Sequence, residues 1–266
     1  MLGIGTWNMG AKRRKRADEI AALQMAVDLG MTVVDTAEMY GDGAAEELIA
    51  EALGARRSDI FLVSKVMPQH ATRQGTISSC EASLRRLKTD RLDMYLLHWR
   101  GSVPLDETLE AFQRLERDGK IRHWGVSNLD VADMEELTGL TVRGGSPAAT
   151  DQVLYNLMRR GIEFDLLPWC LTRGIPVMAY SPLEQGALAG HKTLNAIAAR
   201  LAATPAQIAL AWVLRQPGVI AIPKAGDVEH VRENRGALEI ALAPADLAEL
   251  DNAFPPPARQ RPLEMI

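Results

Sequence analysis

The 266-residue sequence has few cysteines, no excess of positive charge and no long apolar run. Two cysteines, Cys80 and Cys170, are too few for a disulfide framework or a four-thiolate zinc site. A formal net charge of −4 provides no basic field for nucleic acid. No apolar run approaches the roughly 20 residues that span a bilayer, and no secretion signal begins the chain. We therefore expect a cytoplasmic protein with reduced thiols and with neither nucleic acid nor membrane as a partner.

Short apolar segments alternate with stretches of helical spacing along the chain. Some of these segments, such as Phe61-Leu62-Val63, show no polar alternation, which is typical of strands buried on both faces of a parallel sheet. The stretches between them repeat apolar residues at helical intervals, as at Leu105, Leu109 and Phe112. The predicted strands are residues 2–6, 32–35, 60–65, 94–98, 124–127, 148–152, 176–180 and 219–222.

Eight strands, most of them followed by a helix, within about 250 residues predict a (β/α)8 barrel of the α/β class. A doubly wound sheet is the alternative, but it would need fewer strands or a second domain. Because no linker rich in Pro, Gly or Ser divides the chain, residues 1–266 are expected to form a single barrel domain. Two segments exceed the simple repeat: an inserted loop and helix at 186–200, after the seventh strand, and an extra helix at 245–253.

Local signals mark a helix start, a tail and a solvated loop. Thr204 can cap a helix, Pro205 needs no donor at the first helical position, and Gln207 can reach back to the cap. The prolines at 255–257 end the regular structure, so residues 255–266 form a tail that is either mobile or folded over a barrel mouth. The basic run at 12–16 is interpreted as a solvated loop after the first strand.

Polar side chains of complementary chemistry end or follow three of the predicted strands. Side chains at the C-terminal strand ends of such a barrel face one site, and buried charges are costly unless they are paired. An ammonium lowers the pKa of a neighbouring phenol, and a carboxylate keeps the ammonium charged. An imidazole beside them can donate a hydrogen bond to a substrate oxygen. Together these groups can protonate the oxyanion that forms when hydride reaches a carbonyl carbon; they are Asp35, Tyr40, Lys65 and His98.

The other histidines are scattered, and no metal site is predicted. Around the four strand-end residues the sequence resembles the aldo-keto reductase superfamily over nearly the whole chain, from Leu2 to about Phe254. It is most similar to a bacterial branch whose members reduce methylglyoxal and other small aldehydes. The blocks that carry the resemblance are Asp35-Thr36-Ala37-Glu38-Met39-Tyr40-Gly41, Leu62-Val63-Ser64-Lys65, Leu96-Leu97-His98-Trp99, Gly125-Val126-Ser127-Asn128, Ala179-Tyr180-Ser181-Pro182-Leu183 and Ile222-Pro223-Lys224, followed by Glu233-Asn234.

The resemblance implies a barrel that binds NADPH across its C-terminal mouth, and the sequence indeed has no Gly-x-Gly-x-x-Gly motif after a strand. It implies that Tyr40 is the general acid, with its pKa tuned by Lys65. Asp35 would pair with that lysine, and His98 would orient the carbonyl. The implied walls of the substrate pocket are Trp7, Met39, Met67 and Trp99.

Further residues match the cofactor positions of the family. Tyr180 would stack on the nicotinamide, and Lys224 would meet the 2′-phosphate. The remaining positions are assigned to the carboxamide (Ser127, Asn128 and Gln152), to the pyrophosphate and neighbouring parts of the cofactor (Gly5, Thr6, Trp7, Ser181, Pro182, Leu183, Leu188, Ile222 and Pro223), and to the nucleotide end (Ala225, His230, Glu233 and Asn234).

Three departures from the family pattern stand out. Ala225 and His230 replace a Ser and an Arg that often contact the 2′-phosphate, so NADPH is favoured and NADH is the alternative. Asp151 stands where Asn is commoner, with no consequence assigned. The small β-hairpin that usually precedes the first strand is expected to be absent, unless the chain begins late.

Two other functions stay open on the sequence. Some members of the superfamily are channel-associated subunits with the same four residues, so a non-catalytic, cofactor-binding regulatory subunit is the alternative. An unrelated barrel enzyme, such as a sugar-phosphate isomerase or aldolase, would need a phosphate site that serves its substrate. The main hypothesis is a monomeric NAD(P)H-dependent reductase of aldehydes and 2-oxoaldehydes.

Overall fold

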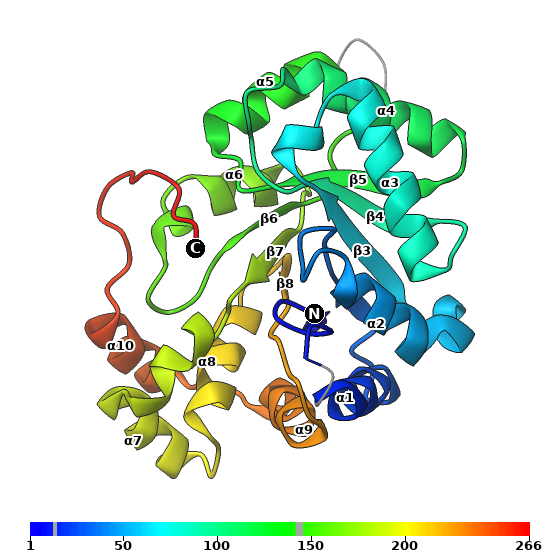
Figure 1. Ribbon diagram of the computed structural model, residues 1–266. Coiled ribbons are helices and arrows are strands. Elements are labelled where there is room, and N and C mark those ends of the chain that lie inside the picture. The colour runs from blue at the N-terminus through cyan, green and yellow to red at the C-terminus, as the bar shows by residue number, and fades with distance from the viewer. Residues whose placement is uncertain (13–14, 142–145) are drawn as a thin grey trace.

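In the computed structural model, which describes residues 1–12, 15–141 and 146–266, eight parallel strands are hydrogen-bonded side by side in chain order. Bridges from Leu2 to Ala221 and from Gly5 to Lys224 close the ring. The predicted (β/α)8 barrel is therefore confirmed (Figure 1). The strands are β1 (Ile4–Gly5), β2 (Val33–Asp35), β3 (Phe61–Val66), β4 (Leu92–Leu97), β5 (Ile121–Ser127), β6 (Asp151–Leu154), β7 (Val177–Tyr180) and β8 (Val219–Ala221).

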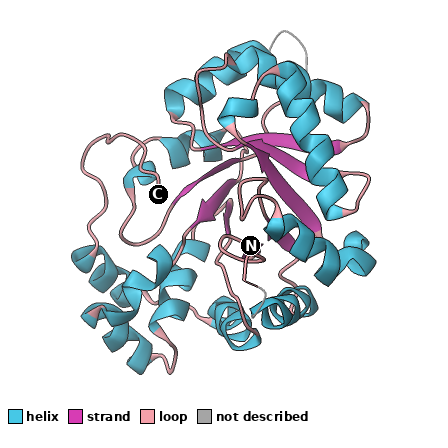
Figure 2. Cartoon of the chain, viewed as in Figure 1, coloured by secondary structure: helices cyan, strands magenta, loops and turns pink. Residues whose placement is uncertain are grey.

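Helices surround the strands (Figure 2). The expected insertion after the seventh strand is the 3-10 segment η5 (Glu184–Gly190) with α7 (Lys192–Arg200), and the expected extra helix is α10 (Pro244–Ala253). At the start of α8, Gln207 N–H donates to Thr204 Oγ1 at 3.2 Å and Thr204 N–H donates to Gln207 Oε1 at 3.0 Å, which confirms the predicted cap. The other helices are α1 (Arg16–Asp28), α2 (Ala44–Leu53), α3 (Arg73–Leu87), α4 (Leu105–Arg117), α5 (Val131–Thr141), α6 (Leu166–Thr172), α8 (Pro205–Leu214) and α9 (Val228–Gly236), with 3-10 segments η2 (Gly54–Asp59), η3 (Pro68–His70), η4 (Gly161–Glu163) and η6 (Ala237–Glu239).

Strand boundaries differ from the prediction where polar residues or a proline intervene. β5 begins at Ile121 and not at 124, because Arg122 and His123 are exposed positions within the strand that resemble loop residues in the sequence. β7 begins at Val177, since Pro176 has no N–H to donate to the ladder. The first element of the described chain is β1.

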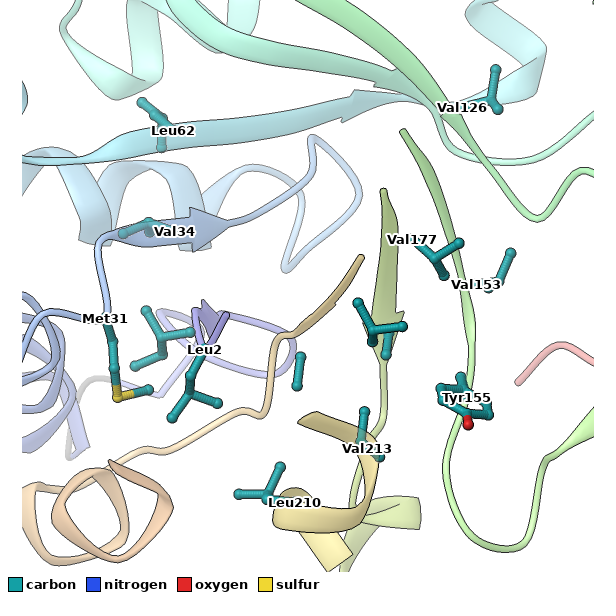
Figure 3. Packing of buried hydrophobic residues seen from close by; sticks show 14 of the residues in the cluster. Leu2, Met31, Val34, Leu62, Val126, Val153, Tyr155, Val177, Leu210 and Val213 are labelled. Carbon is teal, nitrogen blue, oxygen red and sulfur yellow. The ribbon is translucent and has the colours of Figure 1, made fainter. Parts of the chain in front are cut away.

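Alternation of side chains along each strand determines which residues reach the barrel interior. Along β3, Val63 belongs to a small apolar cluster inside the barrel, whereas Leu62 and Val66 belong to a larger cluster between strands and helices. Figure 3 shows the larger cluster, with Leu62 and Val34 on neighbouring strands. Lys65 therefore falls in the inward series, at the mouth end. The interior cluster is Val33, Val63, Met94, Leu96, Met178 and Ile222.

The remaining expectations from the sequence concern membrane spans, metal clusters, cysteines and the basic run at 12–16. Within the described residues, no single helix is long and apolar enough to cross a membrane; α7 and α8 satisfy the length and composition test only as a pair bent by 90°. The same residues contain no cluster of three or more His, Cys, Asp or Glu side chains arranged for a metal ion. Cys80 and Cys170 are free and buried. Within the basic run at 12–16, Arg13 and Arg14 lie outside the described residues.

Asp151 is a buried acid outside the barrel interior. It neighbours Gln152 on β6, and since Gln152 reaches Asp35 inside the barrel, Asp151 projects toward the helices. Neither of its carboxyl oxygens makes a hydrogen bond of standard geometry to the described residues. Burial raises the pKa of Asp151 well above its ordinary value; the Leu129 backbone opposes this rise, and Asp133 adds to it.

We expect Asp151→Asn to stabilise the protein increasingly as the pH rises above about 4. The folded chain keeps a proton that the unfolded chain releases above its pKa of about 3.9, so the wild-type free energy of unfolding falls by about 1.4 kcal/mol per pH unit until the folded pKa is passed. The asparagine side chain cannot ionise, so this part of the slope is lost in the variant. Urea unfolding of both proteins at pH 4, 6 and 8 measures the slopes; parallel slopes would contradict the assignment.

Candidate active site

Lys65 is the centre of the candidate active site. Its Nζ donates to Asp35 Oδ2 at 2.8 Å, to the Thr36 carbonyl at 2.9 Å and to the Tyr40 hydroxyl at 3.1 Å. The other carboxylate oxygen of Asp35 accepts from Gln152 Nε2 at 2.8 Å. One network thus joins β2, β3 and β6; Asp35 and Lys65 lie at the C-terminal ends of their strands as predicted, whereas Gln152 lies near the start of β6, which runs to Leu154 and not to Gln152.

Burial and pairing set the charges in this network. Burial disfavours the Lys65 ammonium, but Asp35 and Tyr40 outweigh it and raise the pKa of Lys65, which stays charged. Burial also raises the pKa of Tyr40 above its ordinary value. The sequence predicted that Lys65 would lower the Tyr40 pKa; the contribution of Lys65 has that sign, but burial outweighs it. Tyr40 therefore holds its proton at neutral pH, beside a cation that favours the phenolate.

His98 follows β4 directly and lies beside Tyr40, with 5.9 Å between the ring centroids. Burial lowers the pKa of His98 to about 3, and the Lys65 charge adds to this effect. The ring is thus neutral at physiological pH and carries one N–H. Its Nδ1 is buried and has no hydrogen-bond partner within the described part of the chain. A neutral imidazole at this position can donate to a substrate oxygen without competing with Tyr40 for the proton.

A cavity of about 810 Å³ opens above these residues at the barrel mouth. Trp7 stands at its edge, 44% exposed, with its ring roughly perpendicular to that of Tyr40 at a centroid distance of 5.0 Å. Lys65 is fully buried below the cavity and reaches it only through Tyr40 and Asp35. The predicted site residues that line the cavity are Gly5, Trp7, Asp35, Met39, Tyr40, His98, Trp99, Ser127, Asn128, Gln152, Tyr180, Ser181, Pro182, Leu183, Ile222, Pro223 and Lys224.

Asn128 ties three strand ends together at one wall of the cavity. It adopts a left-handed conformation with φ of 59°, which asparagine tolerates better than most residues. Its Nδ2 donates to the His98 carbonyl at 3.1 Å and to Ser127 Oγ at 3.0 Å, while its Oδ1 accepts from the Tyr180 hydroxyl at 3.0 Å. Ser127 Oγ donates in turn to the Gln152 carbonyl. The predicted carboxamide residues are thus brought together.

The loop after β7, which we call the strap (residues 181–186), lines the cavity beside Tyr180. Three of its residues other than glycine are left-handed, with φ of 46° at Ser181, 46° at Glu184 and 52° at Gln185. Such conformations persist only where surrounding contacts impose them. Asn156 supplies some of these contacts: its Nδ2 donates to the Ser181 carbonyl at 2.9 Å and to Glu184 Oε2 at 2.7 Å.

Several predicted site residues lie away from this cavity. Thr6 is buried and donates from Oγ1 to the Asp35 carbonyl, so it supports the site from below. Met67, a predicted pocket wall, does not line the cavity; its backbone N–H donates to the Glu38 carboxylate. Beyond Lys224, His230 contacts Asp227 through Nδ1 at 2.6 Å. The predicted site residues absent from the lining of this cavity are Thr6, Lys65, Met67, Leu188, Ala225, His230, Glu233 and Asn234.

Five lining residues were not predicted from the sequence. Asn8 directly follows the predicted Trp7, Gly186 begins the insertion predicted after the seventh strand, and Gln185 directly precedes it, so position alone could have indicated them. Met265 and Ile266 come from the tail, which returns from α10 toward the loop that follows β6 (Figure 1). No sequence pattern indicated them, but of the two alternatives for the tail, the structure shows the folded one.

The chain belongs to the aldo/keto reductase family, whose model matches residues 1–254. It is 52% identical to the methylglyoxal reductase YeaE of Escherichia coli, covering 100% of this chain and 94% of that protein. It is 34% identical to a glyoxal reductase of Bacillus subtilis, covering 86% and 81% respectively. The crystal structure of an aldo/keto reductase from Klebsiella pneumoniae in complex with NADP and acetate matches with a TM-score of 0.95 at 51% identity, covering 100% of this chain and 95% of that one.

Proposed function

We propose that this protein reduces small aldehydes and 2-oxoaldehydes, of which methylglyoxal is the representative, with NADPH as the hydride donor. The observation that carries the proposal is the buried Lys65, hydrogen-bonded to both Asp35 and Tyr40 at the floor of an 810 Å³ cavity. The likeness to a methylglyoxal reductase and to a structure that contains NADP supports the substrate class and the cofactor.

The residues around the cavity fit a dinucleotide laid across the mouth. Gly5 lines one edge, where the backbone packs so closely on β8 that a Cβ would come within 2.9 Å of the Ile222 carbonyl oxygen. Tyr180 offers a ring for the nicotinamide, and the strap can surround the pyrophosphate. Lys224 places an exposed ammonium at the far edge, suited to the 2′-phosphate. When bound, the cofactor supplies a hydride to the carbonyl carbon.

Tyr40 donates the proton that completes the reduction. Its hydroxyl holds a proton at neutral pH and faces the cavity floor, where a carbonyl oxygen gains negative charge as the reaction proceeds. The Lys65 ammonium, 3.1 Å away, stabilises the phenolate that remains. Asp35 keeps the ammonium oriented, and neutral His98 positions the carbonyl oxygen beside the Tyr40 hydroxyl.

The substrate pocket favours small carbonyl compounds. Trp7, Met39 and Trp99 provide apolar walls next to Tyr40 and His98. A pocket of this kind orients a ligand by a few polar groups and leaves little to contact an extended polar chain. Methylglyoxal, with two adjacent carbonyls and one methyl group, is a small carbonyl compound of this kind.

The proposal is tested by titrating the full chain with NADPH and NADH through fluorescence quenching, then adding methylglyoxal and following cofactor absorbance. Tight NADPH binding followed by turnover supports the cofactor and the reaction together. Binding without turnover across a panel of aldehydes would favour the alternative, a regulatory subunit of the same fold. Failure to bind either nucleotide would contradict the proposal.

Lys224→Met is expected to weaken NADPH binding about tenfold, the lower end for a hydrogen bond to a charged group, because Lys224 is exposed. NADH has no 2′-phosphate, so its dissociation constant serves as the internal control and should not change. Ala225 is buried and uncharged, and His230 is held by Asp227, so neither of these two positions supplies a second cation to that phosphate. Equal weakening of both cofactors would show that Lys224 supports the site in another way.

We also propose that residues 1–266 act as one barrel domain, as a monomer in the cytoplasm, without nucleic acid or membrane as a partner. The single ring of strands described above supports the one domain, and two cysteines that are both buried as free thiols support a reducing compartment. Sedimentation of the purified protein at micromolar concentration tests the monomer.

A further inference from the structure

The strap is held in place from a neighbouring tight turn. Residues Asn156 and Arg159 face each other across this turn, joined by two backbone hydrogen bonds. From it, Asn156 reaches Ser181 and Glu184, and Arg159 Nε donates to Glu184 Oε1 at 2.9 Å. The Glu184 side chain is only 11% exposed, so this contact is well shielded.

The same arginine also holds the tail. Arg159 Nη1 donates to Glu264 Oε1 at 2.8 Å, two residues before the end of the segment that lines the cavity. Met265 and Ile266 form part of the cavity wall. Burial raises the pKa of Tyr180 to about 12, and a hydrogen bond between the Ile266 backbone and the Tyr180 hydroxyl partly offsets this rise. The position of Glu264 thus affects the position of Met265 and Ile266 in the cavity wall.

The tail is fixed more firmly at its root, where it leaves Phe254, than at its tip, residues 264–266. Arg160, next to Arg159, is buried and binds the Phe254 carbonyl at 2.5 Å and Asp251 at 2.7 Å, which fixes the root. At the tip, the Arg159–Glu264 pair is exposed, at 35% and 39%, so its contribution is small and sensitive to salt. Leu263 adds partial packing against the core. The contacts of the Arg159–Glu264 pair and of the Ile266 backbone with Tyr180 thus hold the tip less firmly than the buried Arg160 holds the root.

We propose that Arg159 is a positioning residue that couples the strap to the tail, so that cofactor held by the strap favours the tail position in which Met265 and Ile266 wall the substrate pocket. The guanidinium donates from Nε to Glu184 and from Nη1 to Glu264. When bound cofactor orders Glu184, the arginine side chain is held in the orientation that also contacts Glu264. The inference rests on the proposed function, because it takes the strap as a cofactor contact. Carbonyl binding then becomes tighter after NADPH is in place.

Hydrogen–deuterium exchange on the full chain, with and without saturating NADPH, tests the coupling directly. In the wild type, NADPH is expected to slow exchange in the strap and, by about two- to fivefold, in residues 257–266, as suits an exposed ion pair. In Arg159→Gln the strap should still respond, while the tail should not. In Glu264→Gln the tail should exchange faster and be indifferent to NADPH. Glu135→Gln, an exposed helical residue of the same charge type, serves as the matched control and should behave as the wild type.

Steady-state kinetics with methylglyoxal provides an independent measure. Glu264→Gln and Arg159→Gln should each raise the KM for methylglyoxal about two- to fivefold at low salt, and the double variant should be no worse than the single ones. The effect falls on KM because neither side chain contacts Tyr40 or Lys65. At high salt, wild type and Glu264→Gln should converge.

The outcomes separate the coupling from the function beneath it. If NADPH fails to protect the strap in the wild type, the proposed cofactor site is wrong and the coupling falls with it. If the strap is protected but the tail does not respond, or if Arg159→Gln retains the tail response, the coupling alone is overturned. Additive increases of KM in the double variant would also overturn it.

Discussion

Tyr40→Phe is expected to lower kcat by about 10²–10⁴-fold, the usual contribution of a positioned proton donor. The substitution removes only the hydroxyl that lies 3.1 Å from Lys65 Nζ. Lys65 keeps Asp35 and the Thr36 carbonyl as partners, so the buried charge stays paired. NADPH binding should therefore persist, and single-turnover absorbance with methylglyoxal should isolate the loss in the chemical step.

Tyr155→Phe provides the matched control for this experiment. Tyr155 is also buried, but its hydroxyl donates to Glu163 at 2.6 Å, between the strands and the helices. We expect kcat to stay within about twofold of the wild type, with a loss of stability of about 1.5–3 kcal/mol, because the hydroxyl is bonded to a carboxylate and also accepts from Gln216. Near-normal turnover in Tyr40→Phe, with Tyr155→Phe also active, would remove Tyr40 from its proposed role.

Lys65→Met should produce the largest loss of stability among single substitutions in the site. It leaves the Asp35 carboxylate buried with Gln152 as its side-chain partner, and breaking a buried ion pair from one side typically costs about 3–5 kcal/mol. Turnover should fall as well, because no cation then stabilises the Tyr40 phenolate. Urea unfolding monitored by tryptophan fluorescence measures the first effect and NADPH oxidation the second.

A double variant and a control variant make the result of Lys65→Met interpretable. Asp35→Asn combined with Lys65→Met removes both charges and should recover part of the lost stability, but none of the activity. Ser64→Ala lies one residue away on the opposite face of β3, where Ser64 Oγ donates to Glu46 at 2.6 Å. It should cost about 1.5–3 kcal/mol in stability, as for a hydrogen bond to a charged group, and leave kcat unchanged. A double variant no more stable than Lys65→Met would contradict the pairing argument.

The barrel could be predicted because its local signals agree with one another. Eight apolar segments, a capping box at Thr204 and the period of two along each strand all point to the same architecture. The same period explains why the site could be predicted: Asp35 and Lys65 each continue an inward series of apolar residues and end it at the mouth. Chemistry placed on regular elements follows from the pattern that builds those elements.

What the sequence could not provide depends on irregular segments and on burial. The wall formed by Met265 and Ile266 depends on a tail fixed by two arginines far away in the sequence, and no periodicity encodes such contacts. The net rise of the Tyr40 pKa depends on how deeply the phenol is enclosed, which residue type alone does not reveal. Asp151 is similar: its unusual identity was visible, but its burial was not.

The inward position of Lys65 also affects which misfolded states the chain can tolerate. Because side chains alternate, sliding β3 by one residue would exchange Lys65 with Ser64. The ammonium would then lie on the helix side, where Ser64 contacts Glu46 and Arg86 already pairs with that carboxylate, and Asp35 would be left buried without its cation. Leaving a buried charge without its partner is costly. The residues proposed to perform the reaction therefore also penalise the wrong register, so selection for turnover at the mouth of the barrel also selects for accurate assembly of its strands.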